Sequence, residues 1–378
     1  MKPVPAISVV AEPAPPANAP RDATADRLAT LVEAFAVTSP AATSALWQRV
    51  RARCADIGPA VTRLIDDAEA SDGGKHMRPR LVAAAYLGMG GTDRQLLAEV
   101  AGAQQLLHLG LCMHDDVIDG DRVRHGRPNV IGLGERDAHS AGLDASAAAR
   151  QGAASGILAG DLALNAAVLA LLTAPTPVAT RARLAETALE AVERTIAGEL
   201  LDVRSELVAP ARSQPLQVAL LKTASYSVTL PLTLGAIAAG ADDAATLGAL
   251  ERVGSAFGIA YQLSDDDLGL FGSPAITGKS AMSDLRDGKR TEHIRLAHAR
   301  AVDGDRDLID EVLGRADANE RDAARVRAVV TATGARAAVH DLIDRHLDHG
   351  VRVAADDLPP ALAAHLADLA RTLRTRER

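Results

Sequence analysis

Two clusters of adjacent aspartates lie inside long apolar segments of helical periodicity, and they limit what this chain can fold into. Residues 114–119 read HDDVID, and residues 264–267 read SDDD. Adjacent carboxylates about 4 Å apart repel each other by roughly 4 kcal/mol at an effective dielectric constant near 20. A fold that buries the flanking apolar residues must present both clusters to a strongly cationic ligand. Divalent metal is the simplest candidate, because hard cations prefer oxygen ligands.

The composition around these clusters predicts an all-α fold. The 378 residues include only one Trp, three Tyr and three Phe, while Ala and Leu dominate and both favour helix. Runs of β-branched residues typical of strands are scarce. Apolar residues recur at helical spacing from about residue 25 almost to the C-terminus, with Gly and Pro at the breaks. We therefore expect a single helical domain at 25–378.

Other classes of protein are disfavoured by the same sequence. Residues 1–24 are rich in Pro and Ala and predict a disordered tail rather than a signal peptide. The net charge is −8, and no basic stripe indicates nucleic-acid binding. Cys54 and Cys112 are too few for a disulfide framework, which fits a reducing cytosol. We found no uninterrupted apolar stretch of about 18 residues, so we expect no membrane span.

The first acidic cluster has the geometry of a magnesium site. Asp115 and Asp119 are four residues apart and share a helix face, while Asp116 lies about 100° around the axis. Oxygen-only ligands suit Mg²⁺, which is commonly completed by water and substrate phosphates, and no His/Cys set has zinc spacing. Arg124 and Arg127 follow closely, as expected if a phosphorylated ligand lies between cations and metal. The alternative is an ordinary solvated helix end.

Three further polar segments contain basic side chains. Residues 73–80 read GGKHMRPR and precede an apolar helix, so that close backbone approach and a helix start favour an anion. Lys222-Thr223 lies within another apolar segment, and a Gly-rich stretch at 277–291 follows the second acidic cluster. Lysines mixed with carboxylates fit a phosphate that is chelated by metal and also contacted by cations. Each segment alone is equally typical of a solvated loop.

Together these motifs resemble the trans-isoprenyl diphosphate synthases, the polyprenyl synthetase family, over residues 25–378. The matching segments are GGKxxRP at 73–79, DDxxD at 115–119 with RRGxP at 124–128, GD at 160–161, KT at 222–223, FQxxDD at 261–266 and GK…D…GKxT at 278–291. Single short motifs often arise by chance, but this many in the family's order are specific.

The chain departs from the family pattern at three positions. Gly269 stands where the second DDxxD has its last Asp, His125 replaces the second Arg of RRGxP, and Glu199 replaces the Gln of a GQ…D helix. The arginine ordinarily helps to hold the homoallylic diphosphate, so weaker binding or substitution by Arg127 is expected there.

The resemblance implies an all-α bundle around a deep central cavity, a cytoplasmic homodimer, and a reaction between two diphosphates. About three Mg²⁺ ions are implied, held by Asp115, Asp116, Asp119, Asp265 and Asp266. With Arg124, Lys222 and Lys279 they would hold a dimethylallyl, geranyl or farnesyl diphosphate, whose departing diphosphate leaves an allylic cation. The expected contacts to isopentenyl diphosphate are Gly74, Lys75, Arg78, His108 and His125. Further substrate contacts are expected at Thr223, Tyr261, Gln262 and, as a loop contact only, Lys289.

Product length depends on the residues one helical turn before Asp115. These are Gly110 and Leu111. The resemblance implies an aromatic side chain there in members that stop at farnesyl diphosphate. An open path at Gly110 predicts geranylgeranyl diphosphate (C20) or a longer product. The alternative is that Gly110 marks a close helix–helix contact.

Two other functions remain as alternatives. A class I terpene cyclase also uses DDxxD, but its second metal motif would need an acid at Leu250, and Glu251 falls one residue late. A cyclase function would also leave the GGKxxRP-like loop unexplained, because a cyclase has no second diphosphate to bind. A non-catalytic partner subunit of a prenyl synthase would be expected to lose acidic ligands, whereas the first cluster is complete.

Overall fold

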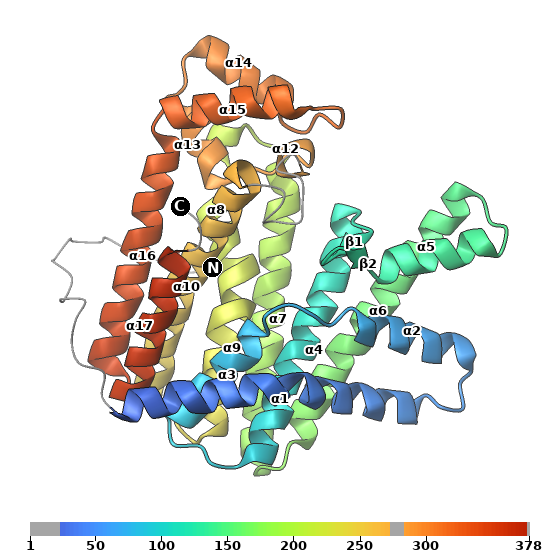
Figure 1. Ribbon diagram of the computed structural model, residues 1–378, viewed down its shortest axis with the longest axis vertical. Coiled ribbons are helices and arrows are strands. Elements are labelled where there is room, and N and C mark those ends of the chain that lie inside the picture. Colours follow the sequence, from blue (N-terminus) through green and yellow to red (C-terminus); the bar gives the residue numbers. More distant parts are fainter. Residues whose placement is uncertain (1–22, 273–282, 376–378) are drawn as a thin grey trace.

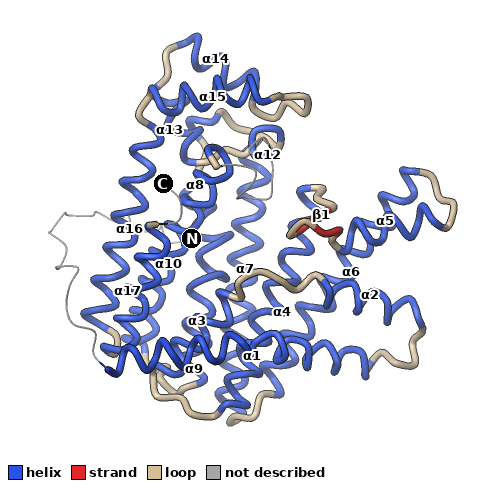
Figure 2. The backbone as a smooth tube through the Cα atoms, viewed as in Figure 1, coloured by secondary structure: helices blue, strands red, loops and turns tan. Residues whose placement is uncertain are grey.

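The computed structural model describes residues 23–272 and 283–375, which are almost entirely helical (Figure 2). The predicted all-α class is confirmed. The predicted tail lies almost wholly outside the described residues, as do Thr277, Gly278 and Lys279. The helices are α1 (Ala23–Arg53), α2 (Pro59–Ala70), α3 (Met77–Gly88), α4 (Arg94–Asp119), α5 (Val130–Ser140), α6 (Ala145–Thr173), α7 (Val178–Ser205), η1 (Pro210–Arg212), α8 (Pro215–Val218), η2 (Ala219–Thr229), α9 (Leu230–Ala238), α10 (Ala244–Phe271), α12 (Ser283–Arg286), α13 (Glu292–Arg300), α14 (Asp303–Val312), α15 (Glu320–Ala332), α16 (Ala335–Asp357) and α17 (Pro360–Arg374).

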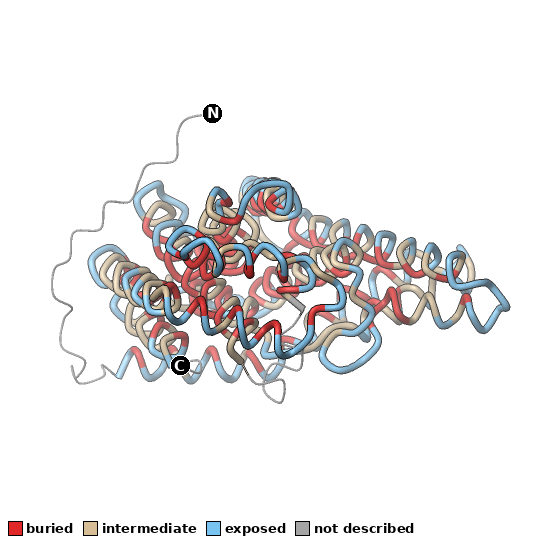
Figure 3. Tube along the Cα trace, turned by 90° about the horizontal axis from the view of Figure 1, so that it is seen from above, coloured by how far each residue is buried: buried red, intermediate tan, exposed pale blue. Residues whose placement is uncertain are grey.

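The core is built from closely packed aliphatic side chains. Helix α4 packs on α6, α10 packs on α16 and η2, and α7 packs on η2. Buried residues lie on the inward faces of these helices (Figure 3). Trp47 and Phe257 are among the few large rings, and both are fully buried. With so few aromatic residues, close approach through Ala and Gly fills the interior, since protein cores pack to near-crystalline density.

A small hairpin follows α4 and is the one piece of strand among the described residues. Strand β1 (Val123–Arg124) pairs antiparallel with β2 (Arg127–Pro128). The two turn residues, His125 at φ 53° and Gly126 at φ 73°, are both left-handed, as a two-residue type I′ hairpin requires. The hairpin, the end of α4 and α12 lie at the same end of the bundle (Figure 1).

The structure qualifies the expectation that no segment could span a membrane. By length and composition α4 and α6 are both long and apolar enough, although charged residues interrupt the pattern. In α4, 72% of the apolar window is buried inside the protein, as in the central helix of a folded core. In α6 only 44% is buried, so this helix presents an apolar face outward.

Candidate active site

The first acidic cluster forms the last turn of α4. Gly120, at φ 70°, ends the helix directly after Asp119 in the left-handed conformation that favours glycine. Asp115 and Asp119 remain partly exposed, with side-chain exposures of 31% and 22%. The predicted shared face is therefore present. The buried Oδ1 of Asp115 makes no hydrogen bond, but it forms an ion pair with the ammonium of Lys222 at 3.2 Å.

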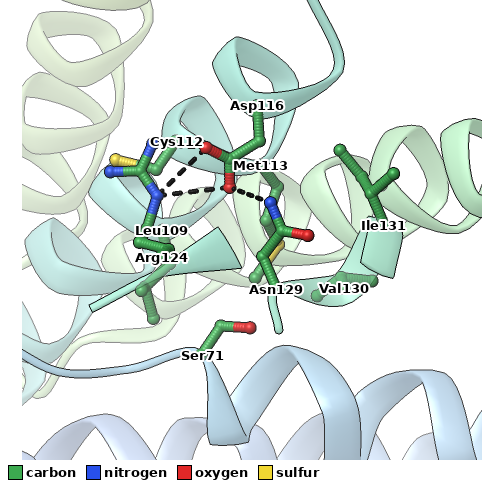
Figure 4. A pocket seen from close by; sticks show the side chains of 10 residues that line it. Ser71, Leu109, Cys112, Met113, Asp116, Arg124, Asn129, Val130 and Ile131 are labelled. Atoms are coloured by element: carbon green, nitrogen blue, oxygen red, sulfur yellow. Dashed lines mark hydrogen bonds and ion pairs between the residues drawn. The ribbon is translucent and has the colours of Figure 1, made fainter. Parts of the chain in front are cut away.

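The side chain of Asp116 points away from the face that Asp115 and Asp119 share. Its carboxylate is only 3% exposed and accepts from Arg124 Nη2 at 2.5 Å, from Arg124 Nε at 3.1 and 3.2 Å, and from Asn129 Nδ2 at 2.9 Å (Figure 4). Both oxygens are thus engaged by the hairpin and the start of α5. In this geometry Asp116, a predicted magnesium ligand, orients Arg124, which lies 3.9 Å from Asp115 Oδ2.

Lys222 joins α4 to α7. Its Nζ lies 3.2 Å from Asp115 Oδ1, 2.8 Å from Glu199 Oε2 and 2.8 Å from Asp202 Oδ2. Burial alone would lower the pKa of Lys222, but the nearby Asp115, Asp202 and Glu199 outweigh it and hold the pKa above its usual value. Lys222 therefore stays charged between three carboxylates. Glu199 and Asp202 were not among the predicted site residues; the GQ…D motif, in which Glu199 replaces Gln, was the available signal.

The close approach of α7 and η2 makes this arrangement possible. A Cβ at Gly198 would lie 2.2 Å from the backbone nitrogen of Lys222, so only glycine permits the contact. Segment η2 is a π-helix, a form that is rare and frequent at functional sites. It carries Lys222 toward α4 and Thr223 toward α10.

The second acidic cluster divides into residues with different surroundings. Asp266 accepts from Gln262 Nε2 at 2.7 Å, and Gln262 Oε1 accepts from Thr223 Oγ1 at 2.5 Å. Although Asp266 retains some exposure, the surrounding protein raises its pKa well above the usual value, and the neighbouring charge of Asp284 adds to this. Asp265 is exposed at the same end of α10. Tyr261 lies one turn earlier on this helix.

Lys289 connects the first acidic cluster to Asp284 on α12. Its Nζ lies 3.5 Å from Asp119 Oδ2 and 3.8 Å from Asp284 Oδ1. Burial alone would lower the pKa of Lys289, but Asp284 and Asp119 outweigh it and raise the pKa. Lys289, predicted only as a loop contact, therefore connects two acidic walls, one formed by Asp115 and Asp119 on α4 and the other by Asp284 on α12.

This donor set fits divalent metal, although the present arrangement is not itself a ligand shell. Across residues 23–272 and 283–375, no group of three or more metal-ligating side chains converges closely enough to hold an ion. The ammonium groups of Lys222 and Lys289 lie between the carboxylates instead. The donors around them are all oxygens, which suits Mg²⁺, and Oδ1 of Asp115 faces this space in an ion pair with Lys222.

A separate basic site surrounds Arg78. Its guanidinium donates to Tyr226 Oη at 3.2 Å and Ser227 Oγ at 2.7 Å, lies 3.1 Å from His108 Nε2, and sits 5.0 Å from the centre of the Tyr226 ring. Burial, reinforced by the charge of Arg78, holds the pKa of His108 well below its usual value. His108 is therefore neutral and can accept from Arg78.

The glycine loop and the hairpin turn meet beside this basic site. The His125 ring lies 3.4 Å from where a Cβ of Gly73 would stand and 3.7 Å from that of Gly74. His76 and His125 are the two non-glycine residues with positive φ in the described chain, a conformation that costs free energy and is concentrated at functional sites. Lys75 is exposed on the same loop. The predicted contacts for a second diphosphate are thus brought together.

Gly110 is the predicted residue whose surroundings differ most from expectation. A Cβ there would lie 2.9 Å from the carbonyl oxygen of Gly160 and 2.9 Å from Leu164 Cγ. The glycine therefore marks the close contact of α4 with α6, the alternative interpretation, rather than an open floor. Leu111 is partly buried and packs against the main core.

The described residues thus form an acidic site, in which Lys289 connects α4 to α12, and a basic site around Arg78. A family model described as polyprenyl synthetase matches residues 62–330. The chain belongs to the polyprenyl synthetase family.

Relatives of known name agree with this assignment. A geranylgeranyl diphosphate synthase of Mycobacterium tuberculosis is 34% identical over 288 residues, covering 69% of this chain and 75% of its own length. A (2E,6E)-farnesyl diphosphate synthase of Mycobacterium bovis is 31% identical over 312 residues, covering 80% of each. A crystal structure of the Corynebacterium glutamicum geranylgeranyl pyrophosphate synthase, complexed with isoprenyl diphosphate and magnesium, superposes with a TM-score of 0.84 at 30% identity, covering 91% of this chain and 99% of that one.

Proposed function

We propose that this protein is a Mg²⁺-dependent prenyl diphosphate synthase that condenses isopentenyl diphosphate with an allylic diphosphate. The observation that carries the proposal is the pairing of two different anion sites. Lys289 connects acidic walls on α4 and α12, while Arg78 and the His125 turn form a basic site that needs no metal. Two diphosphates that play different chemical roles require two such sites.

At the acidic site, Asp115, Asp119, Asp265 and Asp266 are the residues that would hold magnesium. When bound, Mg²⁺ would neutralise the allylic diphosphate and make it a better leaving group. The chain's own cations assist: Lys222, released from its carboxylates, and Arg124, fixed by Asp116, are placed to donate to phosphate oxygens. Such preorganised donors stabilise the charge that develops as the diphosphate departs.

At the basic site, Arg78, Lys75 and His125 would bind isopentenyl diphosphate, with neutral His108 fixing the orientation of Arg78. Immobilising the double bond next to the nascent allylic cation makes the reaction effectively unimolecular. The proton lost after bond formation goes to the released diphosphate, so no side-chain base is required.

Geranylgeranyl diphosphate (C20) or a longer product is the proposed outcome, formed in a deep cavity between the helices. Neither Gly110 nor Leu111 supplies an aromatic ring that would stop growth. Because Gly110 packs closely against α6, its lack of a side chain is weaker evidence for a long product than Leu111. The named relatives include both geranylgeranyl and farnesyl diphosphate synthases. They therefore support the reaction, and the product length rests on the residues of this chain.

We also propose that the protein is a cytoplasmic homodimer joined through α6 and α7. Both helices expose large apolar side chains, a pattern that marks interaction surfaces when contiguous. They are Ile157, Leu158, Leu169 and Leu172 on α6, and Leu189, Ile196, Leu200 and Val203 on α7. The two helices pack on each other, so a second copy of the same face would cover both stripes.

The test uses purified protein with Mg²⁺, isopentenyl diphosphate and, in turn, dimethylallyl, geranyl and farnesyl diphosphate. Diphosphate release and the hydrocarbon obtained after dephosphorylation are measured. The proposal expects release only when both substrates are present, and a geranylgeranyl or longer product. Release from farnesyl diphosphate alone would identify a cyclase, and no release under any condition would identify a non-catalytic subunit.

A further inference from the structure

The glycine loop before α3 is tied to the bundle by Asp72, a largely buried carboxylate that belongs to none of the family motifs. Asp72 directly precedes Gly73, and its side chain is 14% exposed. Its Oδ1 accepts from Gln105 Nε2 at 2.8 Å, and Gln105 is itself only 2% exposed. Gln105 lies three residues before His108 on α4. This hydrogen bond therefore fixes the loop to the helix that carries His108.

His76 continues this tether in a strained backbone conformation. Its φ is 47°, in the left-handed region that is costly for a residue with a side chain. Lys75 is exposed on the loop, whereas the His76 side chain is only 11% exposed. Its Nε2 lies 3.6 Å from Asp72 Oδ1, and its Nδ1 lies 3.5 Å from Ser39 Oγ on α1. Both ring nitrogens therefore face oxygen atoms of neighbouring segments.

A tether matters here because the loop has little means of holding its own shape. Gly73 and Gly74 have no side chains to pack, and glycine loses the most conformational freedom when a chain is ordered. Ordering a mobile loop during binding subtracts from affinity, so donors that are already in position bind more tightly. Strained residues persist only where their surroundings over-determine them, and they are concentrated at functional sites. The position of His76 fits both conditions.

We propose that Asp72 and His76 are positioning residues for the metal-free diphosphate site, and that they hold the glycine loop so that Lys75 is presented to isopentenyl diphosphate. The inference rests on the proposed function, since it concerns how the basic site of that function is held. It predicts a selective effect, because the proposed allylic site lies elsewhere, between α4 and α12. The competing explanation is that the two residues only stabilise the fold.

The two explanations differ in the binding of isopentenyl diphosphate in EDTA, measured by calorimetry. His76→Gly removes the imidazole but keeps the left-handed turn without strain. It is expected to weaken binding about tenfold, the size typical of one lost charge-assisted contact. Asp72→Ala should weaken binding to a similar extent, whereas Asp72→Asn keeps an oxygen that can accept from Gln105 and should stay within about threefold of wild type. The double variant, Asp72→Ala with His76→Gly, should lose no more than about threefold beyond the weaker single variant, because both changes release one tether.

Steady-state kinetics with Mg²⁺ and farnesyl diphosphate separate positioning from folding. In His76→Gly and Asp72→Ala, KM for isopentenyl diphosphate should rise about tenfold, while KM for farnesyl diphosphate stays unchanged. The thermal midpoint is measured for every variant. His139→Ala removes an exposed imidazole from α5 and should bind like wild type. Should Asp72→Ala fail to fold, His76→Gly decides alone, since its backbone change relieves strain.

The outcomes distinguish this inference from the proposed function. If wild type neither binds isopentenyl diphosphate nor condenses it with an allylic diphosphate, the proposed function and this inference fail together. If wild type binds isopentenyl diphosphate but His76→Gly binds it equally well, only the inference is overturned. Equal rises in KM for both substrates would also overturn it, because they would indicate a general loss of structure rather than a displaced loop.

Discussion

Asp267, the third aspartate of the second cluster, connects three helices, and its replacement by asparagine is expected to destabilise the fold. Its Oδ1 lies 3.0 Å from Arg336 Nε and 3.1 Å from His293 Nε2, its Oδ2 lies 3.0 Å from Arg336 Nη2, and His340 Nε2 is 3.3 Å away. The residue is only 4% exposed. Arg336 also stacks on Phe271, with the guanidinium 3.9 Å from the ring centre.

The magnitude follows from what Asp267→Asn leaves behind. Removing one partner of a buried ion pair commonly costs about 3–5 kcal/mol, because the other charge stays buried without compensation. Arg336 is 33% exposed, which places the expected loss near the lower end, about 3 kcal/mol. Equilibrium unfolding in urea at pH 7, followed by circular dichroism, measures the loss of unfolding free energy. Asp303→Asn, on an exposed side chain, should change it by less than about 0.5 kcal/mol.

The pH dependence provides a second check on the same residue. Burial alone would raise the pKa of Asp267, but hydrogen bonds from His293 and Arg336 outweigh it and hold the pKa below its usual value. A depressed folded-state pKa gives stability that is fully present above the unfolded value, near about 4, and is lost as the pH falls below it. The difference in unfolding free energy between wild type and Asp267→Asn should therefore become smaller below about pH 4. A loss of unfolding free energy under about 1 kcal/mol at pH 7, or a difference between the two proteins that stays constant with pH, would refute this reasoning.

Three further outcomes follow from the site and its surroundings. Gly110→Phe should lower the thermal midpoint, because even a Cβ meets the Gly160 carbonyl at 2.9 Å and overpacking costs about 1–3 kcal/mol; an unchanged midpoint with a shorter product would restore the open-floor interpretation. His125→Arg should lower KM for isopentenyl diphosphate about tenfold at pH 8 with kcat little changed, since a permanent cation near Gly74 adds a charge-assisted hydrogen bond of about 1.5 kcal/mol; an unchanged KM would exclude this turn from the diphosphate site. Ile196→Asp should produce monomers in sedimentation experiments, whereas a persistent dimer would place the interface elsewhere.

Much of the architecture was predictable from local pattern. Scarce aromatic residues, abundant Ala and Leu, and a 3.6-residue apolar period fix the helical class, because helical hydrogen bonds and side-chain faces are set within one or two turns. The same periodicity places Asp115 and Asp119 on one face of α4. The order of motifs along the chain also predicted the family that the comparison confirmed.

Tertiary packing decided which neighbour each polar side chain meets. Adjacent aspartates look alike in sequence, yet Asp116 turns to Arg124 and Asp267 to Arg336. Only the approach of α7 to η2 surrounds Lys222 with carboxylates, and only the return of α12 places Asp284 over Gly269. Helical period specifies a direction around one axis, whereas a partner from another helix depends on how closely two axes approach, which is set by contacts distant in the chain.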